Sequence, residues 1–221
     1  METDQEQLDR AAELGSSLLS DALDALGHRH QCLGWDIGPV GAAGSGVAVA
    51  GRALPLAVDT VDAPAEVPYT GLLAALDAVG PGDIVVIPTG RDVATAVWGE
   101  LLSTASRARG AAGIVTDGMV RDVRQVDRLE FPVFARGTVP TDINGRLEIV
   151  GHGVAAHIDD VPISPGDMVI ADGDGVVVVP ADLAGAAVAH AYRKSSDEQS
   201  FRLAVESGML PSEAYRKYRV L

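Results

Sequence analysis

The sequence predicts a mixed α/β protein, and three observations support this. Hydrophobic residues make up 47% of the 221 residues and aromatic residues only 4%, so the core must be built from Val, Ala, Leu and Ile. Two apolar runs, at 81–88 and 165–172, each begin with a Pro-Gly-Asp turn and have the length of a buried strand. Both ends of the chain show the apolar spacing of helices. The length suits one large domain, or at most two small ones.

The first half of the chain predicts helices and strands in alternation. Residues 5–26 form a helical stripe, in which Ser20-Asp21 is an interruption that can cap a second helix, and Gly27 is a C-cap. Residues 44–58 indicate two strands around a glycine. The elements that follow are a short apolar helix, a turn with a buried strand, a short strand and a helix closed by Gly110, at 69–79, 81–88, 93–98 and 101–109.

The second half of the chain is also predicted to contain both strands and helices. Residues 112–116 indicate a strand, 121–129 a short helix and 131–137 a further strand. Two short strands at 146–158, a hairpin at 165–180, a long helix at 181–207 and a short helix near the end complete the series. The absence of a strict βα repeat disfavours a barrel of eight βα units, and the glycines do not match a dinucleotide-binding fingerprint.

The composition narrows the function classes. The 17 basic and 31 acidic residues give a net charge of -14, which disfavours binding to nucleic acid or to anionic membranes. Cys32 is the only cysteine, so neither an internal disulfide nor a zinc cluster of cysteines is expected. The polar start METDQEQLDR does not resemble a secretory signal, and the longest uncharged stretch is too rich in Gly to span a bilayer. We therefore expect a cytoplasmic protein.

The stretch TDGMVRDV, residues 116–123, is the strongest candidate for a site. It follows the buried strand at 113–115, and ligands of open α/β sheets gather at the carboxyl ends of strands. Arg121 can hold a carboxylate through two parallel hydrogen bonds, and Asp122 can offer a hard oxygen to Mg²⁺ or Mn²⁺. The alternative is a solvated helix start with an acidic cap and an unrelated arginine. The residues alone leave both interpretations open.

A second candidate is the helix start in WGELLSTASRARG, residues 98–110. The free backbone N–H groups around Leu101 and Leu102 are suited to a carboxylate or a phosphate. The plainer alternative is that Gly99 permits a tight turn and Glu100 complements the helix dipole, and this stretch alone favours that alternative. The five histidines lack any metal-binding spacing.

The run WGELLSTASRARGAAGIVTDGMVRDV resembles the signature of the RraA-like proteins. That superfamily includes class II pyruvate aldolases acting on 4-hydroxy-4-methyl-2-oxoglutarate and 4-carboxy-4-hydroxy-2-oxoadipate, and inhibitors of ribonuclease E. Further blocks resemble the family along nearly the whole chain, so a single RraA-like domain over 1–221 is expected. These blocks are LLSDALDALG, PGDIVVIP, FPVFARGT, PGDMVIADGDGVVVVP and SGMLPSEAYRKYRVL.

The resemblance implies a β/β/α sandwich similar to the phosphohistidine swivelling domain, with N-terminal and C-terminal helices. It also implies homotrimers or homohexamers whose active sites lie between subunits. By position, Asp122 resembles the metal ligand and Arg121 the residue that binds the pyruvyl group. Gly99 to Leu102 resembles the loop whose amides hold the substrate carboxylate, with Glu100 at the acidic position that orients water. Glu198, or Asp197 beside it, resembles a glutamate delivered by a neighbouring subunit.

The implied activity is cleavage of a 4-hydroxy-2-oxo acid to pyruvate with Mg²⁺ or Mn²⁺, with oxaloacetate decarboxylation as a side activity. Lys194 and Lys217 are the only lysines and both look exposed, which favours a metal route over an imine. Aldolase members often carry an acid at the position of Gln125. Asp127 is the nearest acid that follows, but on a helix it would face elsewhere. The identity of the substrate therefore stays undecided. The alternatives are a non-catalytic regulator of a ribonuclease and a biosynthetic lyase with another substrate; methyltransferase activity is disfavoured.

Overall fold

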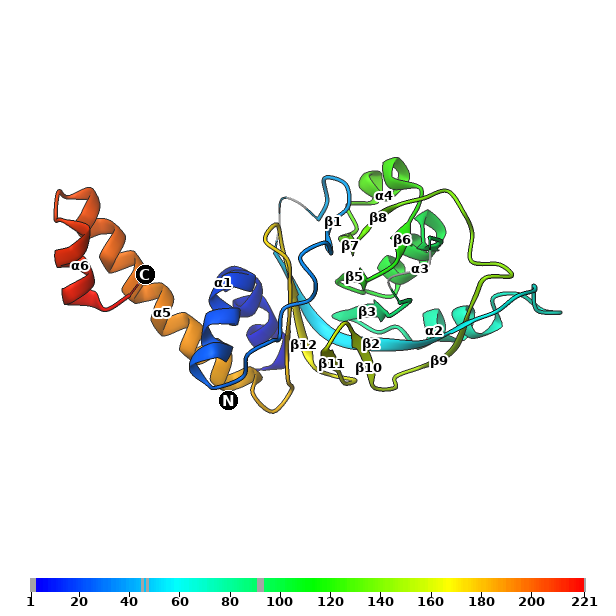
Figure 1. Cartoon of the computed structure of the whole chain (residues 1–221), viewed down its shortest axis with the longest axis horizontal. Helices are drawn as coiled ribbons and strands as arrows, with labels where there is room; N and C mark the ends of the chain where they lie inside the picture. Colours follow the sequence, from blue (N-terminus) through cyan, green and yellow to red (C-terminus); the bar gives the residue numbers. More distant parts are fainter. Residues whose placement is uncertain (1–2, 45, 47, 91–93, 221) are drawn as a thin grey trace.

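The computed structural model describes residues 3–44, 46, 48–90 and 94–220. Over these residues helices and strands are mixed along the chain, which confirms the α/β class (Figure 1). The helices are α1 (Asp4–Ala25), α2 (Thr70–Ala78), α3 (Glu100–Ala108), α4 (Val123–Leu129), α5 (Ala184–Glu206) and α6 (Pro211–Tyr218). The strands are β1 (Gly38–Pro39), β2 (Val49–Thr60), β3 (Asp83–Ile87), β4 (Ala96–Trp98), β5 (Gly113–Thr116), β6 (Met119–Val120), β7 (Val133–Ala135), β8 (Gly137–Thr138), β9 (Leu147–His152), β10 (Ala156–Ile158), β11 (Val161–Ile163), β12 (Met168–Ala171) and β13 (Val176–Val179).

Two sheets organise the middle of the chain. The large sheet has the order β1-β7-β5-β3-β2-β12-β13, with β9 paired to the second half of β2; the small sheet has the order β4-β6-β8. Strands β2, β3, β5 and β7 run parallel, and so do the three strands of the small sheet. Strands β3 and β5 are each followed by one strand of the small sheet and then by a helix, α3 or α4. This repeat is the β/β/α arrangement; the likeness to the phosphohistidine swivelling domain stays a prediction.

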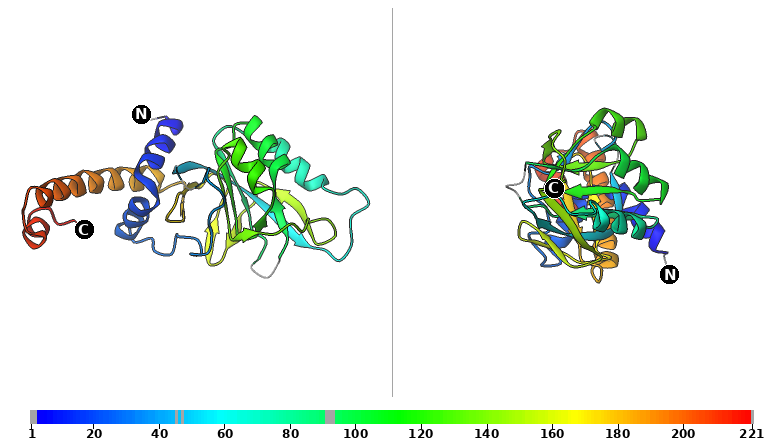
Figure 2. Two further views of the ribbon diagram at one scale, coloured as in Figure 1. Left: turned by 90° about the horizontal axis from the view of Figure 1, so that it is seen from above. Right: turned by 90° about the vertical axis from the view of Figure 1, so that its right-hand side faces the viewer.

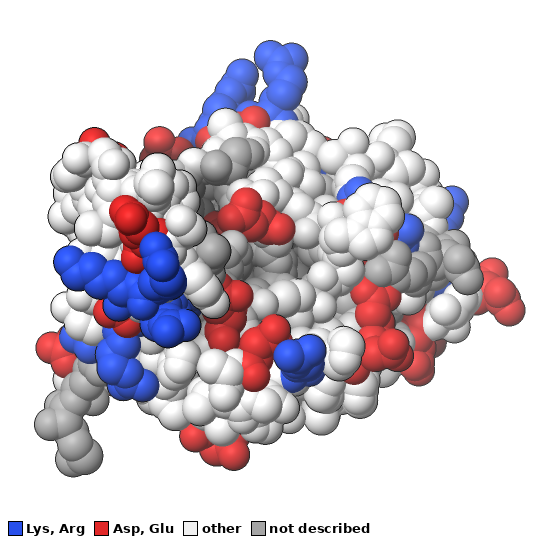
Figure 3. Space-filling model, turned by 60° about the vertical axis from the view of Figure 1, so that its left-hand side comes forward, with Lys and Arg blue, Asp and Glu red and all other residues white. Residues whose placement is uncertain are grey.

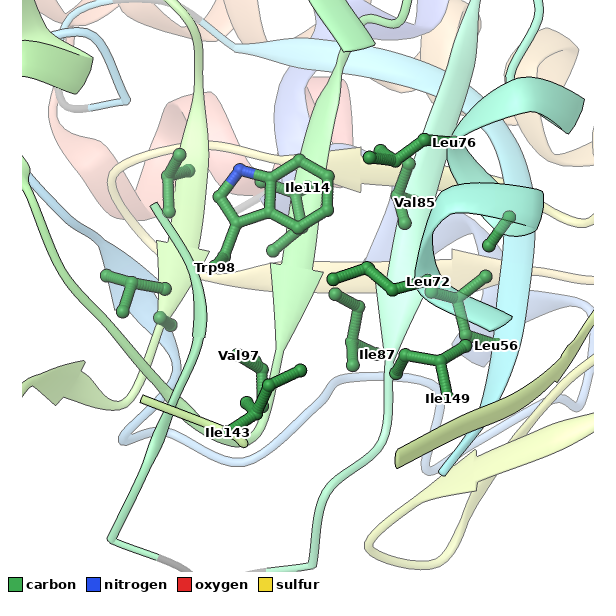
Figure 4. Packing of buried hydrophobic residues seen from close by; sticks show 14 of the residues in the cluster. Leu56, Leu72, Leu76, Val85, Ile87, Val97, Trp98, Ile114, Ile143 and Ile149 are labelled. Atoms are coloured by element: carbon green, nitrogen blue, oxygen red, sulfur yellow. The ribbon is translucent and has the colours of Figure 1, made fainter. Parts of the chain in front are cut away.

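The large sheet is buried on both faces, as is typical of parallel strands. Side chains of β3 alternate between the faces: Val85 and Ile87 join the cluster under α2, α3 and α4, whereas Ile84 and Val86 join the opposite cluster with β10 and β11. Trp98 of the small sheet is almost completely buried in the first cluster (Figure 4). The small sheet is thereby fixed to the large one, and the ends of β4 and β6 lie close together.

The terminal helices form a separate layer. Helix α1 packs on α5 and on β12 and β13, where a third cluster of buried aliphatic side chains lies. Helix α5 then projects away from the sheets and α6 folds back beside it (Figures 1 and 2). The predicted helices at 181–207 and at the end of the chain are thus confirmed.

Helix α1 corrects one expectation. The break lies at Gly15, with φ 80° and ψ 171°, and not at Ser20-Asp21, which continues the helix. Asp172 accepts hydrogen bonds from the Ser16 amide and hydroxyl at 2.7 Å each, so it caps the second half of α1 from the β12–β13 turn. Gly27 is confirmed at the helix end, where its φ is 86°.

The strands bring two further corrections. Residues 44–58 do not form two strands: β2 is one strand of 12 residues in the described part, with Ser45 and Val47 outside the described residues. Residues 131–137 divide into β7 and β8, which belong to different sheets. The strand expected at 93–98 is present as Ala96–Trp98, and Val93 lies outside the described residues. The hairpin at 165–180 and the two strands within 146–158 are confirmed.

Candidate active site

Arg121 and Asp122 are placed by β6, which ends immediately before them. The Arg121 amide donates to the Trp98 carbonyl oxygen at 2.9 Å, so the chain after β6 is held against the end of β4. Asp122 has φ 61° and ψ 30°, a left-handed conformation, and α4 begins at the next residue. The expected helix at 121–129 therefore begins two residues later, and this pair lies on a sharp turn outside it.

The turn brings Asp122 against the start of α3. Asp122 Oδ2 accepts from the Glu100 amide at 3.3 Å. A β-carbon added to Gly99 would lie 2.6 Å from that oxygen and 3.1 Å from Arg121 Cγ. Gly99 has φ −166° and ψ −166°, an extended backbone that any residue adopts, so it does not serve the tight turn expected from the sequence. The glycine is needed because the Asp122 carboxylate occupies the space of a side chain.

Buried hydrogen bonds hold the Gly99 backbone, and with it the start of α3, in place. Trp98 Nε1 donates to Ser103 Oγ at 2.8 Å, and Ser103 Oγ donates to the Gly99 carbonyl oxygen at 2.9 Å. The first intrahelical bond of α3 runs from the Ser103 amide to the same oxygen, so the amides of Leu101 and Leu102 have no intrahelical acceptor. The helix start is rigid, and its amides are available to an anion.

The guanidinium of Arg121 lies between two carboxylates. Its Nη2 atom is 3.2 Å from Asp142 Oδ1, and its Nε atom is 3.8 Å from Asp122 Oδ2. Tyr69 donates its hydroxyl to Asp142 Oδ2 at 2.6 Å. Burial alone would raise the pKa of Asp142, but the hydrogen bonds from Tyr69 and the Asn144 amide and the charge of Arg121 lower it. The same hydrogen bond to Asp142 raises the pKa of Tyr69.

These groups surround a cavity of about 410 Å³ between α2, α3 and the small sheet. Its polar end is formed by Tyr69, Arg121, Asp122 and Asp142, and the rest of its wall is mostly aliphatic. The structure thus brings together Gly99, Leu101, Leu102, Arg121 and Asp122, five of the seven residues that the resemblance pointed to. Tyr69 and Asp142 were not anticipated, because neither carries a sequence motif and each lies far from position 121 along the chain.

The two predicted glutamates lie outside the cavity wall. Glu100 is the first residue of α3, and its Oε1 accepts from the Thr104 hydroxyl at 3.0 Å. Glu198 lies on α5 with Oε1 3.7 Å from Lys194 Nζ, and this chain does not bring it to Arg121. Its delivery by a neighbouring subunit stays a prediction, and Asp197 beside it remains the alternative.

Asp127 lies outside the cavity wall, as its spacing suggests, and so does Gln125. Asp127 accepts from the Ala42 amide at 2.7 Å, on the side of α4 away from the cavity. Gln125 is exposed on α4 and does not line the cavity.

The oxygen donors at the cavity fit a hard, hydrated cation. Mg²⁺ commonly keeps several waters and uses only one or two protein carboxylates, and Asp122 presents a partly exposed carboxylate to the cavity. Among the described residues, no three His, Cys, Asp or Glu side chains gather as a complete metal site. The binding of Mg²⁺ or Mn²⁺ by Asp122, with water or a ligand supplying most of the donors, stays a prediction.

The fold and cavity define an α/β protein in which an Arg-Asp pair follows strand β6 of the small sheet and lies beside the start of helix α3. The family model described as RraA-like (Aldolase/RraA) matches residues 16–178. A protein of Halalkalibacterium halodurans named "Putative 4-hydroxy-4-methyl-2-oxoglutarate aldolase" is 32% identical over 144 residues, which is 65% of this chain and 68% of that protein. The chain belongs to the RraA-like family.

Solved structures agree with this assignment. A protein from Pseudomonas syringae pv. tomato, described as uncharacterized, has a TM-score of 0.83 and 29% identity, covering 97% of this chain and 98% of that one. RraAS2 of Streptomyces coelicolor, described as an unusual member of the RNase ES inhibitor RraA protein family, has a TM-score of 0.79 and 32% identity; the match covers 90% of this chain and 98% of that one. In the described part of the chain, we find no helix with the length and apolarity to cross a membrane.

Proposed function

We propose that the protein is a divalent-metal-dependent C–C lyase that cleaves a 4-hydroxy-2-oxo acid to pyruvate, with oxaloacetate decarboxylation as a related activity. One observation carries the proposal: Arg121, Asp122 and the start of α3 line the same cavity. The Asp122 carboxylate also accepts a hydrogen bond from the Glu100 amide at that helix start. The similarity to a relative named as an aldolase supports the same reaction class.

The pyruvyl half of the substrate is held by groups of this chain. The Arg121 guanidinium faces the cavity and offers planar N–H donors to a carboxylate or a 2-oxo group. The amides of Leu101 and Leu102 lie at the positive end of the α3 dipole and favour an anion in the same space. Together they orient the C3–C4 bond of the substrate for cleavage.

Asp122 is the residue that would hold Mg²⁺ or Mn²⁺. When bound, such an ion supplies Lewis-acid polarisation of the 2-oxo group, which lowers the energy of the enolate formed on cleavage. The backbone contact between Asp122 and Glu100 keeps the carboxylate in place beside Arg121.

Proton transfer requires a base near the distal hydroxyl. A water molecule in the cavity, oriented by Glu100 at the α3 start or by Glu198 of a neighbouring copy in a homotrimer or homohexamer, is the candidate base. The base takes the proton of the 4-hydroxyl, the C3–C4 bond breaks, and its electron pair forms the enolate of pyruvate while C4 becomes a carbonyl. Return of a proton to C3 completes the reaction.

The lysines offer no competing route. Lys194 of α5 is only partly exposed, contrary to expectation, because it is paired with Asp21 of α1 at 2.5 Å. Lys217 lies over the Tyr218 ring on α6. Neither lines the cavity of its own chain, which favours a metal route over an imine.

Pyruvate release from a panel of 4-hydroxy-2-oxo acids and oxaloacetate tests the proposal. EDTA should abolish release, and Mg²⁺ or Mn²⁺ should restore it. Asp122→Asn is the sharpest variant, because Asn tolerates the left-handed backbone and removes only the charge. We expect Asp122→Asn and Arg121→Ala to lower kcat/KM at least about 100-fold. Activity that survives exhaustive chelation, or that persists in Asp122→Asn, contradicts the metal mechanism.

The likeness to RraAS2 supports a second candidate, a regulator that binds a ribonuclease. On the face drawn in Figure 3, Asp and Glu are spread widely, and Lys and Arg occur as one group and several separate side chains without a continuous basic surface. With a net charge of -14, a protein partner suits this protein better than RNA. A pull-down with a ribonuclease and the Asp122→Asn variant separates the two functions. A regulator should keep its partner in that variant, whereas a lyase loses activity.

A further inference from the structure

We propose that Asp142 is a positioning residue: it holds the Arg121 guanidinium at the cavity, where the substrate carboxylate binds, and Tyr69 holds Asp142 in turn. The inference rests on the proposed function, because it assumes that Arg121 receives the pyruvyl half of the substrate. It adds two residues to the site, and both lie outside the stretch at 98–123 that carries the signature.

Strand β4 supports both partners of the ion pair. The Arg121 amide donates to the Trp98 carbonyl oxygen at 2.9 Å, at the end of β4. At the start of the same strand, Ala96 forms a parallel bridge with Asp142, and its amide donates to the Thr141 carbonyl oxygen at 2.8 Å. The backbones of Arg121 and Asp142 are therefore fastened to one strand of three residues, which fixes the distance between them.

The segment at Asp142 has little freedom to move. The Thr95 hydroxyl donates to the Asp142 carbonyl oxygen at 2.9 Å. The next residue, Ile143, is buried in the hydrophobic cluster that also contains Val97 (Figure 4). The Asp142 carboxylate is therefore a fixed point to which a flexible side chain can be attached.

The two oxygens of the Asp142 carboxylate have separate partners. Oδ1 is 3.2 Å from Arg121 Nη2, whereas Oδ2 accepts from the Tyr69 hydroxyl at 2.6 Å and from the Asn144 amide at 3.4 Å. Contacts on both oxygens fix the plane of the carboxylate and keep Oδ1 directed at the guanidinium. Tyr69 has φ 64°, a sparsely populated conformation for a residue with a side chain, so the surrounding structure enforces its place.

The Arg121 side chain needs such a partner. It is 39% exposed, so packing alone does not fix this long and flexible chain. Its ion pairs with described residues use Nη2 and Nε, which leaves Nη1 for a ligand in the cavity. An arginine that is already held in the productive orientation loses less side-chain freedom when a carboxylate binds.

The divalent ion proposed for Asp122 increases the need for Asp142. Asp122 Oδ2 lies 3.8 Å from Arg121 Nε, but a dication on the same carboxylate would offset this attraction, because it repels the guanidinium. Asp142 is then the carboxylate of the cavity wall that still attracts Arg121. The contact keeps the guanidinium in the cavity and prevents it from turning into solvent.

Pyruvate binding tests the inference, and ligand-observed NMR with the whole protein in Mg²⁺ measures dissociation constants in the millimolar range. Asp142→Asn keeps the shape of the side chain and removes its charge. Electrostatics alone predicts tighter binding of the pyruvate anion in this variant, because a negative charge has left the cavity. Positioning predicts the opposite, and we expect the dissociation constant to rise at least about fivefold. Tyr69→Phe, which removes only the hydroxyl, should raise it about threefold.

Arg121→Ala supplies the matched background. Without the guanidinium, Asp142 has nothing to position and only repels the anion, so Asp142→Asn should leave pyruvate binding unchanged or make it tighter. The same comparison of kcat/KM for pyruvate release should show the same change of sign. Asp24→Asn removes an exposed charge from α1 in the unaltered background and should leave pyruvate binding unchanged.

The outcomes separate this inference from the proposed function. Unchanged or tighter pyruvate binding in Asp142→Asn overturns the inference, and so does a lack of pyruvate binding to the unaltered protein. An equal weakening in the Arg121→Ala background also overturns it, because the effect would then not pass through the guanidinium. Pyruvate release from the panel of acids decides the lyase activity independently. Release together with unchanged binding in Asp142→Asn leaves the function standing and removes the inference.

Discussion

Gly99 and Asp122 pack so closely that a β-carbon at position 99 would lie 2.6 Å from Asp122 Oδ2. The two residues are joined further by the Glu100 amide, which donates to the same oxygen at 3.3 Å. The start of α3 and the turn after β6 therefore form one unit, in which neither the helix start nor the carboxylate can shift without the other.

Gly99→Ala should damage the site much more than the fold. The added methyl group must displace the Asp122 carboxylate or the Arg121 stem, and a shift of about 1 Å in a catalytic group costs roughly 100-fold in rate. We expect kcat/KM for pyruvate release to fall by about that factor, with a loss of stability of about 1–3 kcal/mol from overpacking. Gly38→Ala is the control, since a β-carbon there meets nothing within 4 Å. Equal activity in the two variants would show that Asp122 is not held by this contact.

Ser103 and Ser106 provide a matched pair on α3. Both are completely buried, but Ser103 Oγ accepts from Trp98 Nε1 and donates to the Gly99 carbonyl oxygen, whereas Ser106 Oγ has no hydrogen-bond partner within the described structure. Ser103→Ala leaves a buried indole N–H unpaired and should lower the free energy of unfolding by about 1–3 kcal/mol.

Ser106→Ala removes an unpaired hydroxyl and should change the free energy of unfolding by less than about 0.5 kcal/mol. Urea denaturation of both variants measures the difference. A similar loss in the two would mean that the Trp98–Ser103 hydrogen bond contributes nothing to stability.

The Asp142 carboxylate should give the protein a specific acid sensitivity. Its folded pKa lies below the ordinary value of 3.8, so its contacts stabilise the fold above that pH and this contribution is lost as the pH falls through the lowered value. The difference in unfolding free energy between the protein and Asp142→Asn should be constant between about pH 5 and 7 and shrink below about pH 4. Added salt should reduce it, because the carboxylate is partly exposed. A difference that grows on acidification contradicts the assignment.

Much of the site could be predicted because it depends on local sequence. The strand at 113–116 is a short apolar run after a glycine, and the Arg-Asp pair follows its turn at a fixed distance. Residues so close in sequence must share one region of space. Gly99 was also singled out from the sequence, but only the structure shows that the carboxylate of Asp122 fills the place of its side chain.

The rest depends on contacts between distant segments. Strands β6 and β8 have two residues each, too few to show any periodicity, and they exist because β4 pairs with β6 and β6 pairs with β8. Asp142 reaches Arg121 because its segment is tied to β4, and Tyr69 reaches Asp142 from 73 positions away. Local propensity carries no signal for such pairs, so the sequence alone could not assign the polar end of the cavity.

The break in α1 gives the last prediction. Gly15 interrupts the helix, and Asp172 caps the restarted half by accepting from both the amide and the hydroxyl of Ser16. Loss of a helix cap costs about 0.5–2 kcal/mol, and this cap also joins α1 to the β12–β13 hairpin. We expect Asp172→Ala to lower the free energy of unfolding by about 1–2 kcal/mol in urea denaturation. Asp174→Ala, which loses only an exposed contact with Ser17 at 3.1 Å, should cost less than about 0.5 kcal/mol. Equal effects of the two substitutions would show that α1 restarts without the help of Asp172.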